Sequence, residues 1–116
     1  MKKVYHLSTC NTCQRILKEV GPPADLELQD IKTEAMTESQ LEEMKNLAGS
    51  YEALFSRKAR KFRGMGLHEM TLTEDDYKKH ILEEYTFLKR PVFLVDGQIF
   101  IGNTKKVVEA VKEALA

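Results

Sequence analysis

The sequence lacks several features that would assign it to a membrane, secreted or nucleic-acid-binding class. No apolar run approaches the roughly 20 residues that a membrane-spanning helix needs. The 18 basic and 18 acidic side chains cancel, which removes any overall attraction to nucleic acid or to an anionic membrane. No apolar signal core follows the lysine pair at the N-terminus, and we therefore expect a cytoplasmic protein. Repeats, linkers and low-complexity segments are also missing, and the 116 residues suffice for one domain, 1–116, but not for two.

Cysteine is scarce as well, because Cys10 and Cys13 are the only two in the chain. They form a C-x-x-C pair, which in a reducing compartment indicates a catalytic or sensing role more than a structural disulfide. An apolar run at residues 4–7 precedes the pair. The apolar positions after it follow the i, i+3, i+4, i+7 spacing of one helix face: Cys13, Ile16, Leu17 and Val20. The sequence therefore predicts a strand, a turn that carries Cys10, and a helix that begins just before Cys13.

This placement favours unequal roles for the two thiols. Cys10 faces the unpaired N–H groups and the positive dipole end of the helix, which stabilise the reactive thiolate. Cys13 lies one helical turn on and can attack a mixed disulfide formed at Cys10. We expect Cys10 to be exposed with a low pKa, and Cys13 to be more buried with a pKa near its usual value. Asn11 and Thr12 are turn and cap residues whose backbone N–H groups can also cradle an anion near Cys10.

His6 has two interpretations that the sequence leaves open. As a structural residue it is a satisfied histidine at the end of the first strand. As a functional residue it is a histidinium that lowers the pKa of Cys10. A metal site could recruit His6 with both thiolates, but no fourth ligand stands at motif spacing, and we expect no metal.

The remaining elements can be read from turn signals and caps. Gly21 and the two prolines after it end the first helix, and Thr37 opens a second one over about 38–48 with a capping-box spacing. Thr73 opens another helix, whose buried face we expect to carry Tyr77, Ile81 and Tyr85. The other expected elements are a strand over 25–31, a short helical piece over 51–55, a central strand over 92–95, an Asp96–Gly97 hairpin with its return strand over 98–101, and a last helix after Thr104.

Residues 57–63 hold five basic side chains in seven positions. They are either a solvated helix face or a source of cations for a site at Cys10. In the second case one or two of Arg57, Lys58 and Arg60 bind an oxyanion or the carboxylates of glutathione, for which the planar arginine fork is well suited. A nucleic-acid role is not expected, because the run is short and nothing else in this neutral chain supports it.

Three motifs carry a resemblance to a known family: His6 four residues before Cys10, the Arg90–Pro91 pair before the apolar strand, and the Asp-Gly hairpin that leads to Gly102. With the element order, they make the sequence similar to the arsenate reductase (ArsC, glutaredoxin-dependent) and Spx family over almost its whole length. The resemblance implies an α/β, thioredoxin-like fold with a mixed four-stranded sheet flanked by helices. It also implies a helical insertion at about 35–88.

The resemblance further implies that Cys10 is the nucleophile and that Pro91 is a cis-proline opposite it, with Arg90 held nearby to bind an anion. Family arsenate reductases carry three arginines around the oxyanion, and Arg90 matches one of them. The second falls nearest to Ser56, and the third falls at Gly102, as in Spx. Cys13 stands where arsenate reductases usually lack a cysteine. We therefore expect thiol chemistry, with weak or absent arsenate reduction.

Two functions follow from this resemblance. The first is a cytosolic thiol-disulfide oxidoreductase with no bound cofactor, in which Cys13 resolves the intermediate at Cys10. Glutathione, glutaredoxin or thioredoxin would supply its electrons. The second is a redox-switched transcriptional regulator of the Spx kind that docks on the C-terminal domain of the RNA polymerase α subunit. The retained spacing of His6 to Cys10 favours the enzyme.

Overall fold

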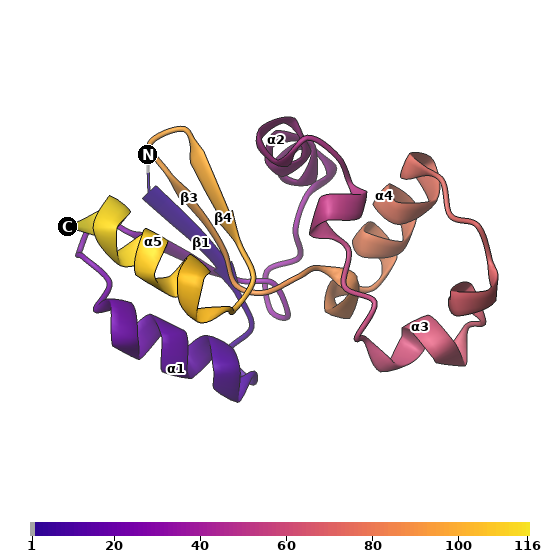
Figure 1. Cartoon of the computed structure of the whole chain (residues 1–116), viewed down its shortest axis with the longest axis horizontal. Coiled ribbons are helices and arrows are strands. Elements are labelled where there is room, and N and C mark those ends of the chain that lie inside the picture. The colour runs from indigo at the N-terminus through magenta and orange to yellow at the C-terminus, as the bar shows by residue number, and fades with distance from the viewer. Residues whose placement is uncertain (1) are drawn as a thin grey trace. The chain divides into compact units, whose positions relative to one another are not determined.

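The computed structural model describes residues 2–116, which form two compact units. The first unit contains the residues up to Ala35 together with Arg90–Ala116, and the second contains Met36–Lys89. Most helices and strands of both units are labelled in Figure 1. That the two units act as one domain stays a prediction.

The first unit is built on a mixed four-stranded sheet in the order β2-β1-β3-β4. β1 (Lys2–His6) pairs in parallel with β2 (Glu27–Asp30) and antiparallel with β3 (Val92–Val95). β3 also pairs antiparallel with β4 (Gln98–Ile101), so β3 is a central strand, as its unbroken apolar sequence predicts. β1 begins and ends slightly earlier than expected, which leaves Leu7 between the strand and the following turn.

The hairpin between β3 and β4 depends on two residues with positive φ. Asp96 has φ 47° and Gly97 has φ 86°. Positive φ at both central residues matches the right-handed twist of the flanking strands, and Asp-Gly is among the pairs that adopt it at low cost. The hairpin predicted from these two residues is confirmed.

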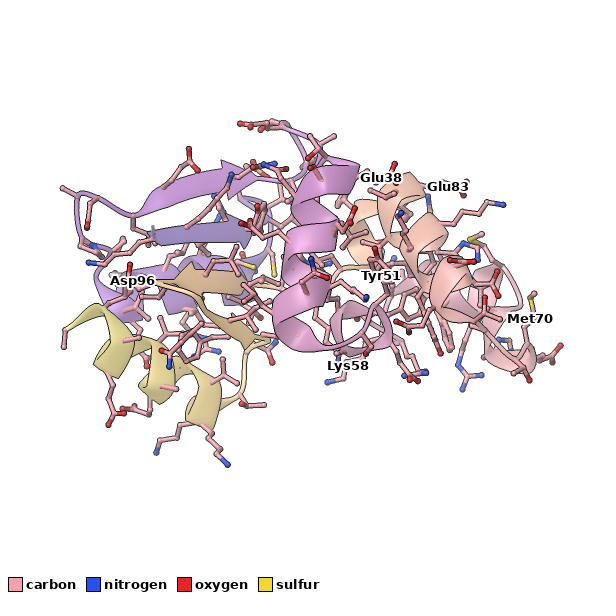
Figure 2. All side chains as sticks on the ribbon, turned by 90° about the horizontal axis from the view of Figure 1, so that it is seen from above. Glu38, Tyr51, Lys58, Met70, Glu83 and Asp96 are labelled. Carbon is pink, nitrogen blue, oxygen red and sulfur yellow. The ribbon has the colours of Figure 1, made fainter. Side chains whose placement is uncertain are left out.

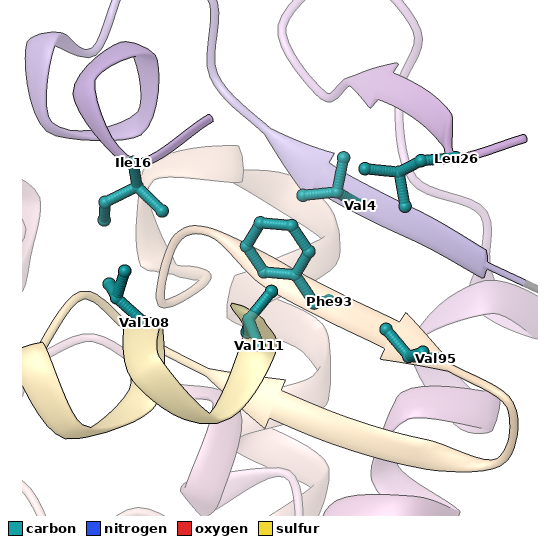
Figure 3. Packing of buried hydrophobic residues seen from close by; sticks show 7 residues of the cluster. All are labelled: Val4, Ile16, Leu26, Phe93, Val95, Val108 and Val111. Carbon is teal, nitrogen blue, oxygen red and sulfur yellow. The ribbon is translucent and has the colours of Figure 1, made fainter. Parts of the chain in front are cut away.

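Two helices of this unit, α1 (Asn11–Val20) and α5 (Lys105–Leu115), pack against the sheet (Figure 1). Their apolar stripes and the side chains of the strands bury a common core (Figure 3). This core consists of Val4, Ile16, Leu26, Phe93, Val95, Val108 and Val111. It fixes the start of α1 relative to the end of β1, which is where the cysteines lie.

The second unit is helical. Its α-helices are α2 (Glu38–Ala48), α3 (Arg60–Gly64) and α4 (Glu74–Glu83), and its short 3-10 turns are η1 (Glu52–Leu54), η2 (Leu67–Glu69) and η3 (Tyr85–Phe87). The capping boxes predicted at Thr37 and Thr73 are both formed. The ring of Phe55 stacks on Phe87 with 5.0 Å between centroids, and aromatic packing of this kind forms the unit's core.

One expectation for the second unit is wrong. Tyr77 and Ile81 are buried on α4, but Tyr85 is only half-buried. The helix ends at Glu83, and Tyr85 lies in η3, where the chain no longer follows the helical period that predicted its burial. Side chains on the outside of this unit include Lys58 and Met70 (Figure 2), of which Met70 is 57% exposed.

Candidate functional site

The turn between β1 and α1 presents Cys10 at the start of a helix. Residues 8 and 9 form the turn, which closes where the Cys10 N–H donates to the Leu7 carbonyl at 3.0 Å. Cys10 is the N-cap residue of α1 in an extended conformation, and its carbonyl accepts from the Gln14 N–H at 3.0 Å. The sulfur of Cys10 is therefore attached just outside the helix, in the position that the sequence predicts.

The surroundings of Cys10 favour its thiolate. Partial burial opposes the charge, but the N–H groups of Cys13 and Thr12, the Cys13 thiol and the positive charge of Arg90 together hold the pKa of Cys10 below its usual value. The sulfur does not complete a well-formed capping hydrogen bond. The N–H groups act on it mainly as aligned dipoles at the positive end of α1. The predicted low pKa is thus supported by several small effects that point the same way.

Cys13 lies on the inner face of α1 and is fully buried. Burial raises its pKa to about 11, and the neighbouring Cys10 charge adds to the rise. Its predicted burial is confirmed, but the expectation of a near-normal pKa is wrong. The dipole of the helix start cannot offset the loss of water around a sulfur that the core encloses. Both thiols are free, and at neutral pH Cys13 remains protonated.

The peptide bond between Arg90 and Pro91 is cis, as the resemblance implies. Pro91 precedes β3, and its carbonyl accepts from the Gly102 N–H at 3.0 Å. The charge of Arg90 favours the ionised form of Cys10 and of Cys13. Arg90 is therefore close enough to the pair to stabilise negative charge that develops on either sulfur.

His6 occupies the last position of β1 and is half-buried. Burial lowers its pKa, and the nearby carboxylate of Asp30 only partly opposes this. This burial works against a charged histidinium, and a role of His6 at Cys10 stays a prediction. Its Nδ1 atom is buried without a hydrogen-bond partner among the described residues.

The basic run belongs to the second unit. Arg57 donates from one guanidinium nitrogen to Glu52 Oε2 and to the Tyr77 hydroxyl, both at 2.8 Å. An external anion would have to compete with this carboxylate for Arg57. Lys58 and Arg60 are exposed and form no ion pair within residues 2–116. Of these three cations, Lys58 and Arg60 are thus the ones that are available to an anion without breaking an internal contact.

Asn11 and Thr12 are the first two residues of α1. Asn11 is exposed and Thr12 is half-buried. No group of three His, Cys, Asp or Glu side chains in the described part of the chain is placed to hold a metal ion. Among the same residues, no helix is both long and apolar enough to cross a membrane.

Three polar residues next to Cys10 were not singled out from the sequence. The Ser8 hydroxyl and N–H both donate to the Asp30 carboxylate, and the Gln14 amide donates to the Ser8 carbonyl. Ser8 and Asp30 are 22 positions apart in sequence. No local spacing rule connects them, and only the parallel pairing of β1 with β2 brings them together.

The sheet order, the two covering helices and the C-x-x-C pair at a helix start define a thioredoxin-like fold. A profile of the ArsC family matches residues 5–111, and the chain belongs to that family. The match spans both units, including the cysteine turn and the Arg90–Pro91 bond.

Solved structures support the same fold. The YffB protein superposes with a TM-score of 0.81 at 21% identity, and the alignment covers 100% of both chains. The arsenate reductase from Vibrio cholerae gives a TM-score of 0.76 at 18% identity, covering 98% of this chain and 97% of the other. An arsenate reductase (ArsC) related protein from Brucella melitensis gives 0.71 at 22% identity, covering 94% and 92%. A comparison with curated protein sequences finds no match.

Proposed function

We propose that this chain is a thiol-disulfide oxidoreductase of the ArsC family, with Cys10 as nucleophile and Cys13 as resolving thiol. The observation that carries the proposal is the placement of the two thiols. Cys10 is the N-cap of α1 and Cys13 is buried one turn on, so the pKa of Cys10 is lowered and that of Cys13 is raised to about 11. With a thiolate at Cys10 and a protonated thiol at Cys13, Cys10 attacks the substrate first, and Cys13 reacts only after a mixed disulfide has formed.

The reaction proceeds through two exchanges. The Cys10 thiolate attacks one sulfur of a substrate disulfide, a mixed disulfide forms, and the other substrate sulfur leaves as a thiolate. Cys13 then loses its proton to solvent or to the departing thiolate and attacks the sulfur of Cys10. A Cys10–Cys13 disulfide forms and the second substrate sulfur leaves, so the substrate gains two electrons and the protein loses two.

Arg90 and the start of α1 stabilise the charges in this sequence. Negative charge is present on Cys10 before its attack, and it passes from Cys13 to the leaving external sulfur when Cys13 attacks Cys10. The positive charge of Arg90 favours ionisation at both sulfurs, as required. The oxidised pair is returned to the dithiol by glutathione, glutaredoxin or thioredoxin. No bound cofactor enters this scheme, and docking on RNA polymerase is not proposed, because nothing in residues 2–116 or in the comparisons supports it.

Arsenate is a poor candidate for the substrate. Gly102 stands where the resemblance places a third arginine, and its φ is 98°. A side-chain-bearing residue at this φ is strained, so the loop itself disfavours an arginine there. Without this cation, an oxyanion at Cys10 would rely on Arg90, whose charge favours the ionised form of both cysteines.

The proposal is tested by incubating the reduced protein with a mixed disulfide of glutathione and a small thiol. The released thiol and the intact mass of the protein are then followed. We expect release of free thiol, an intact mass lower by two hydrogens, and turnover when glutathione or glutaredoxin is added. Cys13→Ser should stop at a protein–glutathione adduct on Cys10. Cys10→Ser should form neither this adduct nor an internal disulfide. An adduct on Cys13, or full turnover by Cys10→Ser, would overturn the assignment.

A further inference from the structure

Ser8 is held from the side of the sheet by Asp30. Its hydroxyl donates to Asp30 Oδ2 at 2.5 Å, and its backbone N–H donates to Asp30 Oδ1 at 3.4 Å. Ser8 is the first residue of the two-residue turn that leads to Cys10. The Asp30 carboxylate therefore binds the turn through both the side chain and the backbone of Ser8.

The Asp30 anchor is itself fixed in place. It pairs in register with His6 at the end of the parallel β1–β2 ladder. Its carbonyl accepts from the N–H groups of Thr33 and Glu34 at 3.1 and 2.8 Å, and its Oδ1 accepts from the Lys32 N–H at 3.1 Å. A carboxylate restrained by this many bonds loses little additional freedom when it binds Ser8.

Gln14 holds the same turn from the side of the helix. Its side-chain amide donates to the Ser8 carbonyl, and its backbone N–H donates to the Cys10 carbonyl. Ser8 thus has its hydroxyl, N–H and carbonyl all engaged, by one residue from β2 and one from α1. The turn between them is short, so these contacts also restrict where the Cys10 sulfur can lie.

We propose that Ser8, Asp30 and Gln14 are positioning residues for Cys10, because they hold its sulfur beside the first N–H groups of α1. The inference rests on the proposed function only in taking Cys10 as the nucleophile. None of the three touches the reacting sulfur in the contacts described, and they act through the backbone of the turn. When the turn loosens, the sulfur spends less time near the N–H groups of Thr12 and Cys13 and loses part of their stabilisation.

The direction in which the pKa of Cys10 changes distinguishes a positioning role from a direct effect of charge. Asp30 carries a negative charge, and removing a nearby negative charge on its own makes a thiolate easier to form. A charge effect therefore lowers the pKa of Cys10 in Asp30→Asn and leaves it unchanged in Ser8→Ala. A positioning effect raises the pKa of Cys10 in both variants.

The experiment measures the ultraviolet absorbance of the Cys10 thiolate against pH in the full, reduced chain, with Cys10→Ser as the baseline. Ser8→Ala removes only the hydroxyl, and Ser8→Thr restores it. Asp25→Asn is the charge control, because Asp25 is an exposed carboxylate of the same unit that pairs with Lys2 and does not contact the turn. Circular dichroism melts establish that each variant is folded.

We expect Ser8→Ala to raise the pKa of Cys10 by about half a unit, which lowers the thiolate fraction about threefold below the pKa. Asp30→Asn should raise it in the same direction, while Ser8→Thr and Asp25→Asn should match the parent protein. An unchanged pKa in Ser8→Ala, or a lowered pKa in Asp30→Asn, overturns the positioning role. The titration needs no substrate, so a protein that shows these shifts but reduces no disulfide refutes the proposed function alone.

Discussion

Selective alkylation of Cys10 tests the site most directly, because it compares two thiols within one chain. The reduced protein is treated with limiting iodoacetamide at about pH 6, where the thiolate is the reacting species. The pKa of Cys13 is raised to about 11, whereas that of Cys10 lies below its usual value of about 9. The two pKa values therefore differ by more than about two units.

This difference sets a lower bound on the selectivity. Two pKa units correspond to about a hundredfold larger thiolate fraction at Cys10. The thiolate of Cys13 is intrinsically more nucleophilic because its pKa is higher, and this recovers about half of the difference on a logarithmic scale. Cys10 should still react at least about tenfold faster, and the burial of Cys13 should increase the ratio further.

Peptide mass spectrometry gives the ratio of the two labelled sites. Repeating the reaction at several pH values should show the Cys10 rate rising with pH, with its midpoint below the usual value of about 9. Denatured protein is the control, because both cysteines then approach the same ordinary pKa and should label to similar extents. Equal labelling of the two sites in the folded protein, or preference for Cys13, would refute the reasoning.

Three further predictions concern stability and substrate. Phe93→Ala removes a fully enclosed ring from the core of the first unit and should lower the free energy of unfolding by about 3–5 kcal/mol in urea titrations. Thr37→Ala removes the hydroxyl that accepts from the Gln40 N–H at the start of α2 and should cost about 1 kcal/mol in the same assay. With arsenate, glutathione and glutaredoxin, turnover should be weak or absent, because the missing bidentate contact at Gly102 should cost about 1.5–3 kcal/mol of binding.

The two stability predictions have matched controls. Leu28→Ala shortens a side chain that is 48% exposed, and it should change stability far less than Phe93→Ala. Thr37→Ser keeps the capping hydroxyl and should be close to neutral. A loss from Leu28→Ala equal to that from Phe93→Ala would argue against the core described here, and arsenate turnover near the roughly 10 per second of ordinary enzymes would overturn the substrate prediction.

Much of the fold follows from local sequence because short-range chemistry decides it. The apolar period after Cys10 places α1, the Thr37 and Thr73 boxes place the starts of α2 and α4, and Asp96–Gly97 supplies the positive φ values of the hairpin. The unbroken apolar strand Val92–Val95 indicates burial on both faces, and so a central place in the sheet. The residues that decide these features lie within a few positions of one another, so the features can be predicted from local sequence.

The ionisation states at the site were decided by the tertiary structure. Cys13 and Cys10 share one helix start, yet burial raises the pKa of Cys13 to about 11, and burial also lowers the pKa of His6. Desolvation depends on what packs around a group, and those atoms come from distant parts of the chain. The sequence alone placed Cys10 at the start of α1, where it is the N-cap residue. Two features depend on the folded sheet and could not be predicted locally. One is which thiol stays protonated, and the other is the hydrogen bonding of Asp30 in β2 to the turn before Cys10.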